Sequence, residues 1–445
     1  MKSLFTPLKA EGLTTLKINY DYKTDKVRFY CAREWESNLD FSRYNKDFYA
    51  ESILTENARY LNTSEVTALY AKYDLSEYLD GVVDLIRKGK HFGMECYYNE
   101  KYDIRFMCNI HSLKLGVNNK SHATMAGGIR RHGFDTPEIE VIIDGLNLGR
   151  GMTFKNIAAD LNYGGCKTTV HMDPLTQEKM DNLDLMGFLA FTIDRCRVLT
   201  AADMDFPTEM SDVINKHFSV QYVCGPSAPI GESGRPTAYG TYLAVKQAVK
   251  SETGSESLDG MSIALQGLGA VGWYAAEHFL GEKVKLYVSD INKKVVDDFV
   301  KTHPNADIIA VEGDIMKLQA DIFCPCAIGG ILHDGNIPGL RFKYIIGAAN
   351  NTLKASSQEE EIRLANLIAE QGILYQTDWW HNTAGVLCGV EHYLYGDDAE
   401  YESFIGKIEK NVPVKTWENL TKSKQLGITP TENAYRMCQE IVYCE

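Results

Sequence analysis

A lysine in a glycine-rich segment is the first residue whose position suggests chemistry. Lys167 follows Gly164-Gly165-Cys166 directly, where the backbone is expected to turn tightly. A lysine held in a cleft there can act as a base if burial or neighbouring positive charge favours its neutral amine. A surface lysine beside a turn is the alternative, and composition alone favours that interpretation.

A second motif points to a nucleotide. Residues 267–272 read Gly-Leu-Gly-Ala-Val-Gly and fit G-x-G-x-x-G, after the apolar segment 261–265 and before a helical segment. Such glycines permit a tight turn and a close approach of the backbone to a pyrophosphate, and an acidic residue ending the next strand binds the ribose hydroxyls. Asp290 holds that position. The alternative is a glycine turn used only for packing. The predicted cofactor-binding residues here are Gly267, Gly269, Ala270, Val271, Gly272, Asp290 and Ile291.

The charge of Asp290 also bears on the choice of cofactor. It would repel a 2′-phosphate, so NAD is favoured over NADP. Lys293 and Lys294 lie close enough along the chain to weaken that preference. Alternatively, both lysines begin the following helix on its solvent face.

Two kinds of hydrophobic pattern describe the elements that must position these motifs. Residues 17–30 alternate as a strand does, residues 65–89 have helical spacing, and residues 101–110 look like a strand. A Gly/Pro/Ser cluster at 225–240 marks a domain boundary. Beyond it, strand-like and helical segments interleave, which predicts a parallel sheet with helices on both faces. The last sixty residues or so read as helical.

Several further motifs, in a fixed order, resemble one family. They begin with Gly127-Gly128 and GMTFKN…LNYGGCKT…DP within residues 149–174, and the similarity runs from about Ala126 to Glu391. The chain resembles the glutamate/leucine/phenylalanine/valine dehydrogenases, most closely the leucine and phenylalanine enzymes. The remaining matching segments are residues 199–203, 235–240, 267–272, 324–330, 347–351 and 382–385.

The resemblance implies a role for each matching residue. Lys167 corresponds to the general base that activates water against an imino intermediate, and Asp203 to the aspartate that exchanges protons with the substrate amine. Lys155 corresponds to the lysine that binds the α-carboxylate, which Gly127 and Gly128 also help to hold. Asn350 and Asn351 fall at the family's asparagine near the nicotinamide and the carboxylate; which of them acts stays open, with Asn350 assigned to substrate and Asn351 to cofactor. Thr237 and Ala327 are expected at the cofactor.

The side-chain pocket is expected to be apolar and large. By the resemblance it is formed by Ala126, Ala201, Val386 and Gly389. Glutamate-specific members carry a lysine at the position of Ala126, so glutamate is disfavoured. Small residues at Ala126 and Gly389 favour a bulky or aromatic side chain, although apolar pockets discriminate by only ~1–3 kcal/mol per methylene. A branched aliphatic substrate is the alternative, as is a residue of the unmatched N-terminal region filling the space.

The resemblance implies an α/β fold with two domains and an extended N-terminal region. Residues 1–235 are expected to form an α/β substrate-binding and oligomerisation domain, with helices of 385–445 packing back on it. Residues 236–384 are expected to form a Rossmann NAD domain. The expected activity is reversible, NAD-dependent oxidative deamination of an L-amino acid by a homo-oligomer.

Composition excludes some other functions. The formal charge of −14 leaves no basic excess to neutralise nucleic-acid phosphates, and Arg130-Arg131 is interpreted as a solvated face. No segment resembles a signal peptide or membrane span, and eleven scattered cysteines suggest reduced thiols in the cytoplasm. Cys324-Pro325-Cys326 has no second pair at zinc spacing, so no metal is expected and a buried strand end is favoured.

Two rival functions remain. One is a non-catalytic, NAD-binding relative, and the other is an enzyme that acts on an amine or a β-amino acid. The presence together of Lys155, Lys167 and Asp203 argues against the first, since a binding module needs none of that chemistry. Lys155, as the α-carboxylate ligand, weighs against a simple amine.

Overall fold

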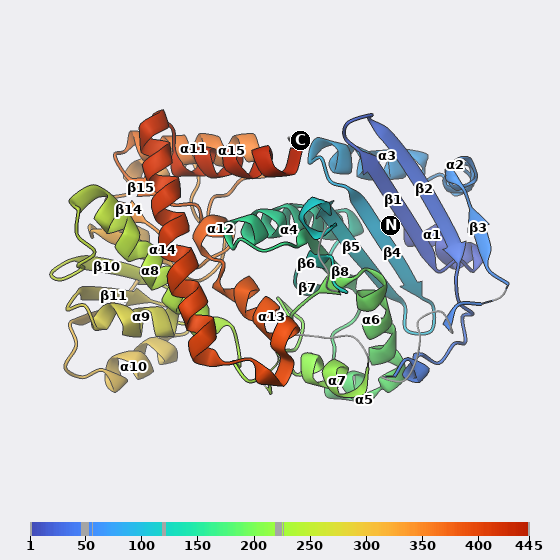
Figure 1. Cartoon of the computed structure of the whole chain (residues 1–445), viewed down its shortest axis with the longest axis horizontal. Coiled ribbons are helices and arrows are strands. Elements are labelled where there is room, and N and C mark those ends of the chain that lie inside the picture. The colour runs from blue at the N-terminus through green and yellow to red at the C-terminus, as the bar shows by residue number, and fades with distance from the viewer. Residues whose placement is uncertain are drawn as a thin grey trace. The chain divides into compact units, whose positions relative to one another are not determined.

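The computed structural model describes residues 2–45, 53–55, 57–117, 122–218, 225 and 227–443. The chain divides into two compact units (Figure 1). Unit 1 comprises Met1–Asn156, Leu161–Gly231 and Gly389–Ala399, and unit 2 comprises Ile157–Asp160, Glu232–Cys388 and Glu400–Glu445.

Unit 1 is built on a mixed sheet that is nine-stranded over the described residues. Its order is β3-β2-β1-β4-β5-β8-β6-β9, with β7 also paired to β8. The neighbouring strands β3, β2, β1, β4, β5 and β8 pair antiparallel in that order. Strands β6 and β7 run parallel to β8. The strands are β1 (Thr15–Asp21), β2 (Lys26–Arg33), β3 (Arg59–Leu61), β4 (Gly93–Asn99), β5 (Ile104–Ser112), β6 (Met125–Ala126), β7 (Ile129–His132), β8 (Gly164–His171) and β9 (Val198–Leu199).

Helices cover both faces of this sheet, because successive apolar side chains along its strands point to opposite faces and form a core on each. On β5, Phe106 and Cys108 join the core beneath α6, whereas Met107 joins the core beneath α3 and α4. On β8, Cys166 and Val170 belong to the α6 core, so Lys167 faces the α4 side. The helices are α1 (Phe5–Glu11), α2 (Thr63–Lys72), α3 (Ser76–Lys88), α4 (Glu138–Ala158), α5 (Gln177–Asp181), α6 (Leu183–Arg195) and α7 (Glu209–His217).

The N-terminal region that matched no motif is an integral part of this sheet. Strands β1, β2, β4 and β5 lie in it, and β5 pairs directly with β8, which carries Lys167. The strand predicted at 17–30 is a hairpin of β1 and β2. The single helical segment predicted at 65–89 is two helices, because the chain turns between them with Asp74 at a φ of 55°.

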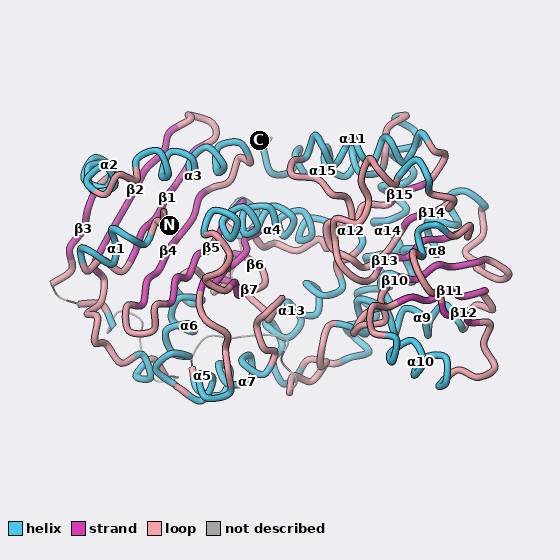
Figure 2. The backbone as a smooth tube through the Cα atoms, turned by 180° about the vertical axis from the view of Figure 1, so that it is seen from behind, coloured by secondary structure: helices cyan, strands magenta, loops and turns pink. Residues whose placement is uncertain are grey.

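Unit 2 contains the predicted parallel sheet, visible as adjacent strands in Figure 2. Its order is β12-β11-β10-β13-β14-β15, and every pairing is parallel. The strands are β10 (Ser262–Gln266), β11 (Lys285–Ser289), β12 (Ile308–Ala310), β13 (Ile322–Pro325), β14 (Tyr344–Ile345) and β15 (Leu374–Tyr375). The helices are α8 (Gly234–Thr253), α9 (Gly272–Leu280), α10 (Lys293–Thr302), α11 (Gln358–Glu370), α12 (Asp378–His381), α14 (Tyr401–Leu426) and α15 (Pro430–Tyr443).

The C-terminal helices correct one prediction. We expected residues 385–445 to pack on the substrate domain, yet residues 400–445 belong to unit 2 and only Gly389–Ala399 to unit 1. The reason is that α14 lies along α8 (Figures 1 and 2). The two helices are in contact at Gly240 of α8, where a Cβ atom would lie 3.6 Å from Val412 and 3.7 Å from Ile408, both ordinary van der Waals distances. Helix α13 (Ala384–Tyr395) is divided between the units.

Among the described helices, none combines the length and the apolar composition that a membrane crossing requires.

Candidate active site

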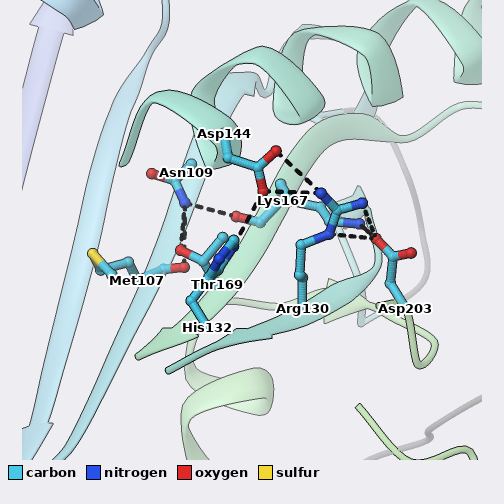
Figure 3. Close-up of polar contacts among 8 residues, drawn as sticks. All are labelled: Met107, Asn109, Arg130, His132, Asp144, Lys167, Thr169 and Asp203. Carbon is cyan, nitrogen blue, oxygen red and sulfur yellow. Dashed lines mark hydrogen bonds and ion pairs between the residues drawn. The ribbon is translucent and has the colours of Figure 1, made fainter. Parts of the chain in front are cut away.

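Lys167 and Asp203, predicted as the chemical pair, meet in unit 1 (Figure 3). Lys167 lies on β8, its side chain is only 6% exposed, and its Nζ donates to Asp203 Oδ2 in an ion pair. The segment after β9 brings Asp203 there by running beside β7. The backbone N–H of Asp203 donates to the Ile129 carbonyl at 3.0 Å, and that of Ile129 to the Ala201 carbonyl at 2.9 Å.

The predicted glycine turn lies against the lysine. A Cβ atom on Gly128 would be 3.0 Å from Lys167 Nζ and 3.4 Å from Asp203 Cβ. A Cβ atom on Gly127 would be 1.9 Å from the Cys166 carbonyl oxygen. Gly127 therefore permits close backbone packing, and Gly128 leaves room for the amine of Lys167.

Arg130 extends the pair into a network of ion pairs. Its Nη2 lies 3.1 Å from Asp203 Oδ2, and its Nη1 donates to both carboxylate oxygens of Asp144 at 3.0 and 3.1 Å. His132 Nε2 donates to Asp144 Oδ2 at 3.2 Å (Figure 3). The solvated-face interpretation is wrong for both arginines, whose side chains are 15% and 10% exposed.

The physical reason lies in strand alternation. On β7, Arg130 and His132 point to the same face, toward Asp144 of α4, and Arg131 points to the other. Arg131 there binds Asp205 Oδ2 at 2.7 Å and the Met172 carbonyl at 3.0 Å. The sequence does not predict this arrangement, because β7 has only four residues and such a short strand shows no clear alternation of apolar and polar residues.

The two cations fix the charge of Asp203. Burial by itself would raise the pKa of this carboxyl, but the charges of Lys167 and Arg130 outweigh burial and hold the pKa well below its usual range. Burial also opposes ionisation of Asp144, and hydrogen bonding from His132 with the charge of Arg130 lowers its pKa. Both carboxyl groups are therefore ionised near neutral pH.

Asn109, in the unmatched N-terminal region, supports Lys167 from beneath. It lies opposite Lys167 in the β5–β8 pairing, and its Nδ2 donates to the Lys167 carbonyl at 3.1 Å and to Thr169 Oγ1 at 3.2 Å. Helix α4 covers it closely, since a Cβ on Gly145 would lie 2.2 Å from Asn109 Nδ2. No motif pointed to Asn109, because its role depends on pairing between distant strands.

The predicted substrate residues occupy several elements. Lys155 lies half-buried in the last turn of α4. Ala126 is buried on β6, and Ala201 lies beside the glycine turn, its carbonyl oxygen 3.3 Å from a Cβ built on Gly128. Val386 and Gly389 both lie on α13, the first assigned to unit 2 and the second to unit 1. Their substrate roles stay predictions.

The glycine motif of unit 2 forms a turn between β10 and α9. Gly267 has a φ of 93°, and a Cβ on Gly272 would lie 1.8 Å from the Gly267 carbonyl oxygen, so both positions require glycine. A Cβ on Gly269 would meet nothing within 4 Å, which leaves that face of the turn open. Asp290, after β11, accepts from the backbone N–H groups of Leu268 and Asn292, each at 2.8 Å.

Other predicted cofactor residues follow the carboxyl ends of neighbouring parallel strands. Ala327 follows β13 and touches the glycine turn, since a Cβ on Gly267 would lie 2.8 Å from its Cβ. Asn350 and Asn351 follow β14; Asn350 Oδ1 accepts from Asn382 Nδ2 at 3.4 Å, and the N–H of Asn351 donates to Asp378 Oδ2 at 3.0 Å. Ile291 is fully exposed after β11, whereas Thr237 is buried on α8. The turn, the open face and the acid at a strand end fit a dinucleotide.

The fold and the two sites define an α/β protein with a dinucleotide-type unit and a unit in which a buried lysine is paired with an aspartate. Residues 115–220 match the Glu/Leu/Phe/Val dehydrogenase dimerisation domain. The chain is 36% identical to leucine dehydrogenase of Geobacillus stearothermophilus, over 69% of this chain and 82% of the relative. It is 33% identical to phenylalanine dehydrogenase of Lysinibacillus sphaericus, over 74% and 84%.

A solved structure agrees with these relatives. L-tryptophan dehydrogenase from Nostoc punctiforme superposes with a TM-score of 0.65 at 26% identity, covering 81% of this chain and 98% of that one. The chain belongs to the Glu/Leu/Phe/Val dehydrogenase family.

Proposed function

We propose that this chain is an NAD-dependent dehydrogenase that oxidatively deaminates an L-amino acid with an apolar side chain to the 2-oxo acid and ammonia. The observation that carries the proposal is the ion pair of the buried Lys167 with Asp203, to which Arg130 adds a second cation. The family relatives that are named for leucine and phenylalanine support the reaction class.

In the proposed reaction, Asp203 and Lys167 each carry out one proton transfer. Asp203, held as a carboxylate, accepts a proton from the substrate ammonium, which frees the amine's electron pair for imine formation. A bound nicotinamide would supply the acceptor for the hydride from Cα. Lys167 then takes a proton from the water that attacks the imine carbon. When Lys167 is neutral, Arg130 still compensates the charge of Asp203, because a guanidinium does not give up its proton in this pH range.

The residues that would hold the substrate backbone are Lys155, Gly127, Gly128 and Asn350. Lys155 would pair with the α-carboxylate, and the glycines let that carboxylate approach the Lys167 amine. A fixed carboxylate orients Cα, which is the contribution of such anchors to catalysis.

NAD is the proposed cofactor, held by the glycine turn with Thr237, Asp290, Ile291, Ala327 and Asn351. Two backbone hydrogen bonds hold the Asp290 carboxylate at the end of β11, where a 2′-phosphate would meet its charge. Lys294, which could offset that charge, pairs with Asp298 at 2.5 Å.

A bulky or aromatic apolar amino acid is the proposed substrate, with a branched aliphatic one as the second candidate. The position where glutamate-specific members carry a cation is the buried Ala126, so a second carboxylate would lack its partner. The structural relative that is named for L-tryptophan favours the aromatic choice, and those named for leucine and valine favour the other.

We further propose a homo-oligomer in the cytoplasm. The matched family domain is described as a dimerisation domain, which supports self-association. All nine cysteines in the described part of the chain are free thiols, as expected in a reducing compartment.

The test is NADH formation over a panel of L-amino acids with wild type, Lys167→Ala and an exposed-lysine control, Lys88→Ala. We expect turnover with apolar substrates, a loss of roughly 10²–10⁴-fold in kcat for Lys167→Ala with NAD affinity retained, and an unaffected control. Absence of turnover with any amino acid despite NAD binding would refute the enzyme. Glutamate as best substrate would refute the argument from Ala126.

A further inference from the structure

Two thiols in unit 2 form a close pair that the proposed reaction does not use. Cys324 lies in β13 and Cys326 follows its end, and their Sγ atoms are 3.7 Å apart. Side chains at i and i+2 of a strand point to the same face, which explains why they meet. Cys324 is buried and Cys326 is partly exposed, so Cys326 is the more accessible residue of the two.

Their mutual contact makes the two thiols chemically unequal. The hydrogen bond from Cys324 lowers the pKa of Cys326; burial opposes that shift, and the backbone N–H of Ala348 adds to it. The same hydrogen bond, together with burial, raises the pKa of Cys324 well above its usual range. Because the thiolate is the nucleophile, Cys326 reacts first and Cys324 remains a thiol beside it.

We propose that Cys324 and Cys326 are a dithiol modification site, which a hydroperoxide converts to an intrachain disulfide that weakens dinucleotide binding. The Cys326 thiolate attacks one peroxide oxygen and breaks the O–O bond, giving a sulfenic acid and, from hydrogen peroxide, hydroxide. The Cys324 sulfur then attacks the sulfenic sulfur, and its proton leaves with the departing hydroxyl as water. The two thiols lose two electrons, and hydrogen peroxide becomes two molecules of water.

The coupling to the cofactor site follows from what surrounds Cys326. A disulfide needs Cα atoms about 4.4–6.8 Å apart, and two residues along an extended strand already lie near the upper limit. Closing the bond therefore bends the backbone at Cys326, whose N–H donates to the Gln266 carbonyl at 2.7 Å. A Cβ on Gly272 would lie 3.2 Å from Cys326 Cβ, so the displaced segment meets the glycine turn.

The effect of the disulfide on NAD binding and the effect of NAD on disulfide formation must be reciprocal. If the disulfide weakens NAD binding tenfold, saturating NAD stabilises the dithiol form and raises the midpoint potential of the pair by about 30 mV. Protection by NAD is thus a second readout, and it involves no amino acid turnover.

A tryptic peptide isolates the site. Residues 318–341 lie between Lys317 and Arg341 and contain Cys324 and Cys326 as their only cysteines. The full-length protein is treated with hydrogen peroxide, alkylated, digested and analysed by mass spectrometry, and NAD affinity is measured in parallel before and after dithiothreitol. Cys324→Ala removes the resolving thiol, and Cys438→Ala, a buried cysteine of α15, is the matched control.

We expect this peptide to lose two hydrogens and resist alkylation in wild type and Cys438→Ala, with NAD affinity falling at least about tenfold and recovering on reduction. Cys324→Ala should form no disulfide in the peptide and keep its NAD affinity. Full alkylation of both cysteines after peroxide overturns the proposal, and so does a disulfide that leaves NAD affinity unchanged. If the reduced protein binds no NAD, the proposed function fails, while the peptide mass still decides whether the dithiol reacts.

Discussion

Two carboxyl groups of unit 1, the buried Glu138 and the partly buried Asp203, have pKa values shifted in opposite directions. Glu138, at the start of α4, accepts hydrogen bonds from Ser3 Oγ, the Leu4 N–H at 2.6 Å and Tyr78 OH at 3.1 Å. Asp203 is held instead by Lys167 and Arg130. Burial raises the pKa of Glu138, against the three neutral hydrogen-bond donors, whereas two cations lower that of Asp203.

The difference shows that burial alone does not distinguish Glu138 from Asp203, the carboxyl group for which we propose a catalytic role. Glu138 is the more buried of the two, yet its partners are the N-terminal segment and a tyrosine of α3, which it ties to α4. Asp203 has a lysine that can exchange a proton with it and an arginine that cannot. A titratable partner beside a permanent charge is what permits proton transfer while the site stays compensated.

The largest expected effect comes from replacing the carboxyl group of Asp203 by an amide of the same shape, with the same replacement at Glu138 as the comparison. Asp203→Asn should lower kcat by roughly 10²–10⁴-fold, because the amide cannot accept the substrate proton. Glu138→Gln should leave kcat within about twofold, because this residue touches no proposed catalytic group. Steady-state assays of both variants against wild type decide the point. Equal losses in the two would erase the distinction between a catalytic and a structural carboxyl.

A smaller effect is expected at Arg130, proposed as a positioning residue. Arg130→Met leaves Asp203 with Lys167 alone, so the pKa of Asp203 should rise and the acidic limb of kcat/KM should move to higher pH. We expect kcat to fall about ten- to a hundredfold, as for a displaced catalytic group. Arg130→Lys should recover only part of the lost kcat, since an ammonium group cannot bridge Asp203 and Asp144 as the planar guanidinium does.

The neighbouring residue supplies the control. Arg131→Met removes contacts to Asp205 and the Met172 carbonyl on the other face of β7, so its pH profile should match wild type. If the two variants shift the acidic limb equally, Arg130 acts only through general stability.

Local signals in the sequence were enough for unit 2. The glycine turn, the acid after β11 and the parallel strands depend on residues close together in the chain, and the period of apolar residues reports them directly. The Lys167–Asp203 pair also appeared, but only through family resemblance, because its two members come from different elements.

The rest of the site depends on long-range pairing. Asn109 reaches Lys167 through the β5–β8 register, and Arg130 of β7 reaches Asp144 of α4 across fourteen residues of chain. Neither contact leaves a periodic pattern in the chain. The same holds for the packing of α14 on α8, which places Ile408 and Val412 beside Gly240 from a distant part of the chain.

The smallest predicted effect is on stability, and it has opposite signs for the two carboxyl groups. A raised folded-state pKa means that Glu138 contributes stability below its unfolded pKa of about 4.3, and that this contribution is lost as pH rises through the folded value. The lowered folded-state pKa of Asp203 means that this residue contributes stability above its unfolded pKa of about 3.9. That contribution is lost as pH falls below this value. The free energy of unfolding of Glu138→Gln relative to wild type should therefore rise with pH above about 4.3 and then level off, by about 1.4 kcal/mol for each unit of pKa elevation removed. For Asp203→Asn the corresponding difference should change only below about pH 4. Urea titrations across both windows measure the two curves, and a Glu138→Gln difference that stays constant across pH would show that burial does not penalise the charge of Glu138.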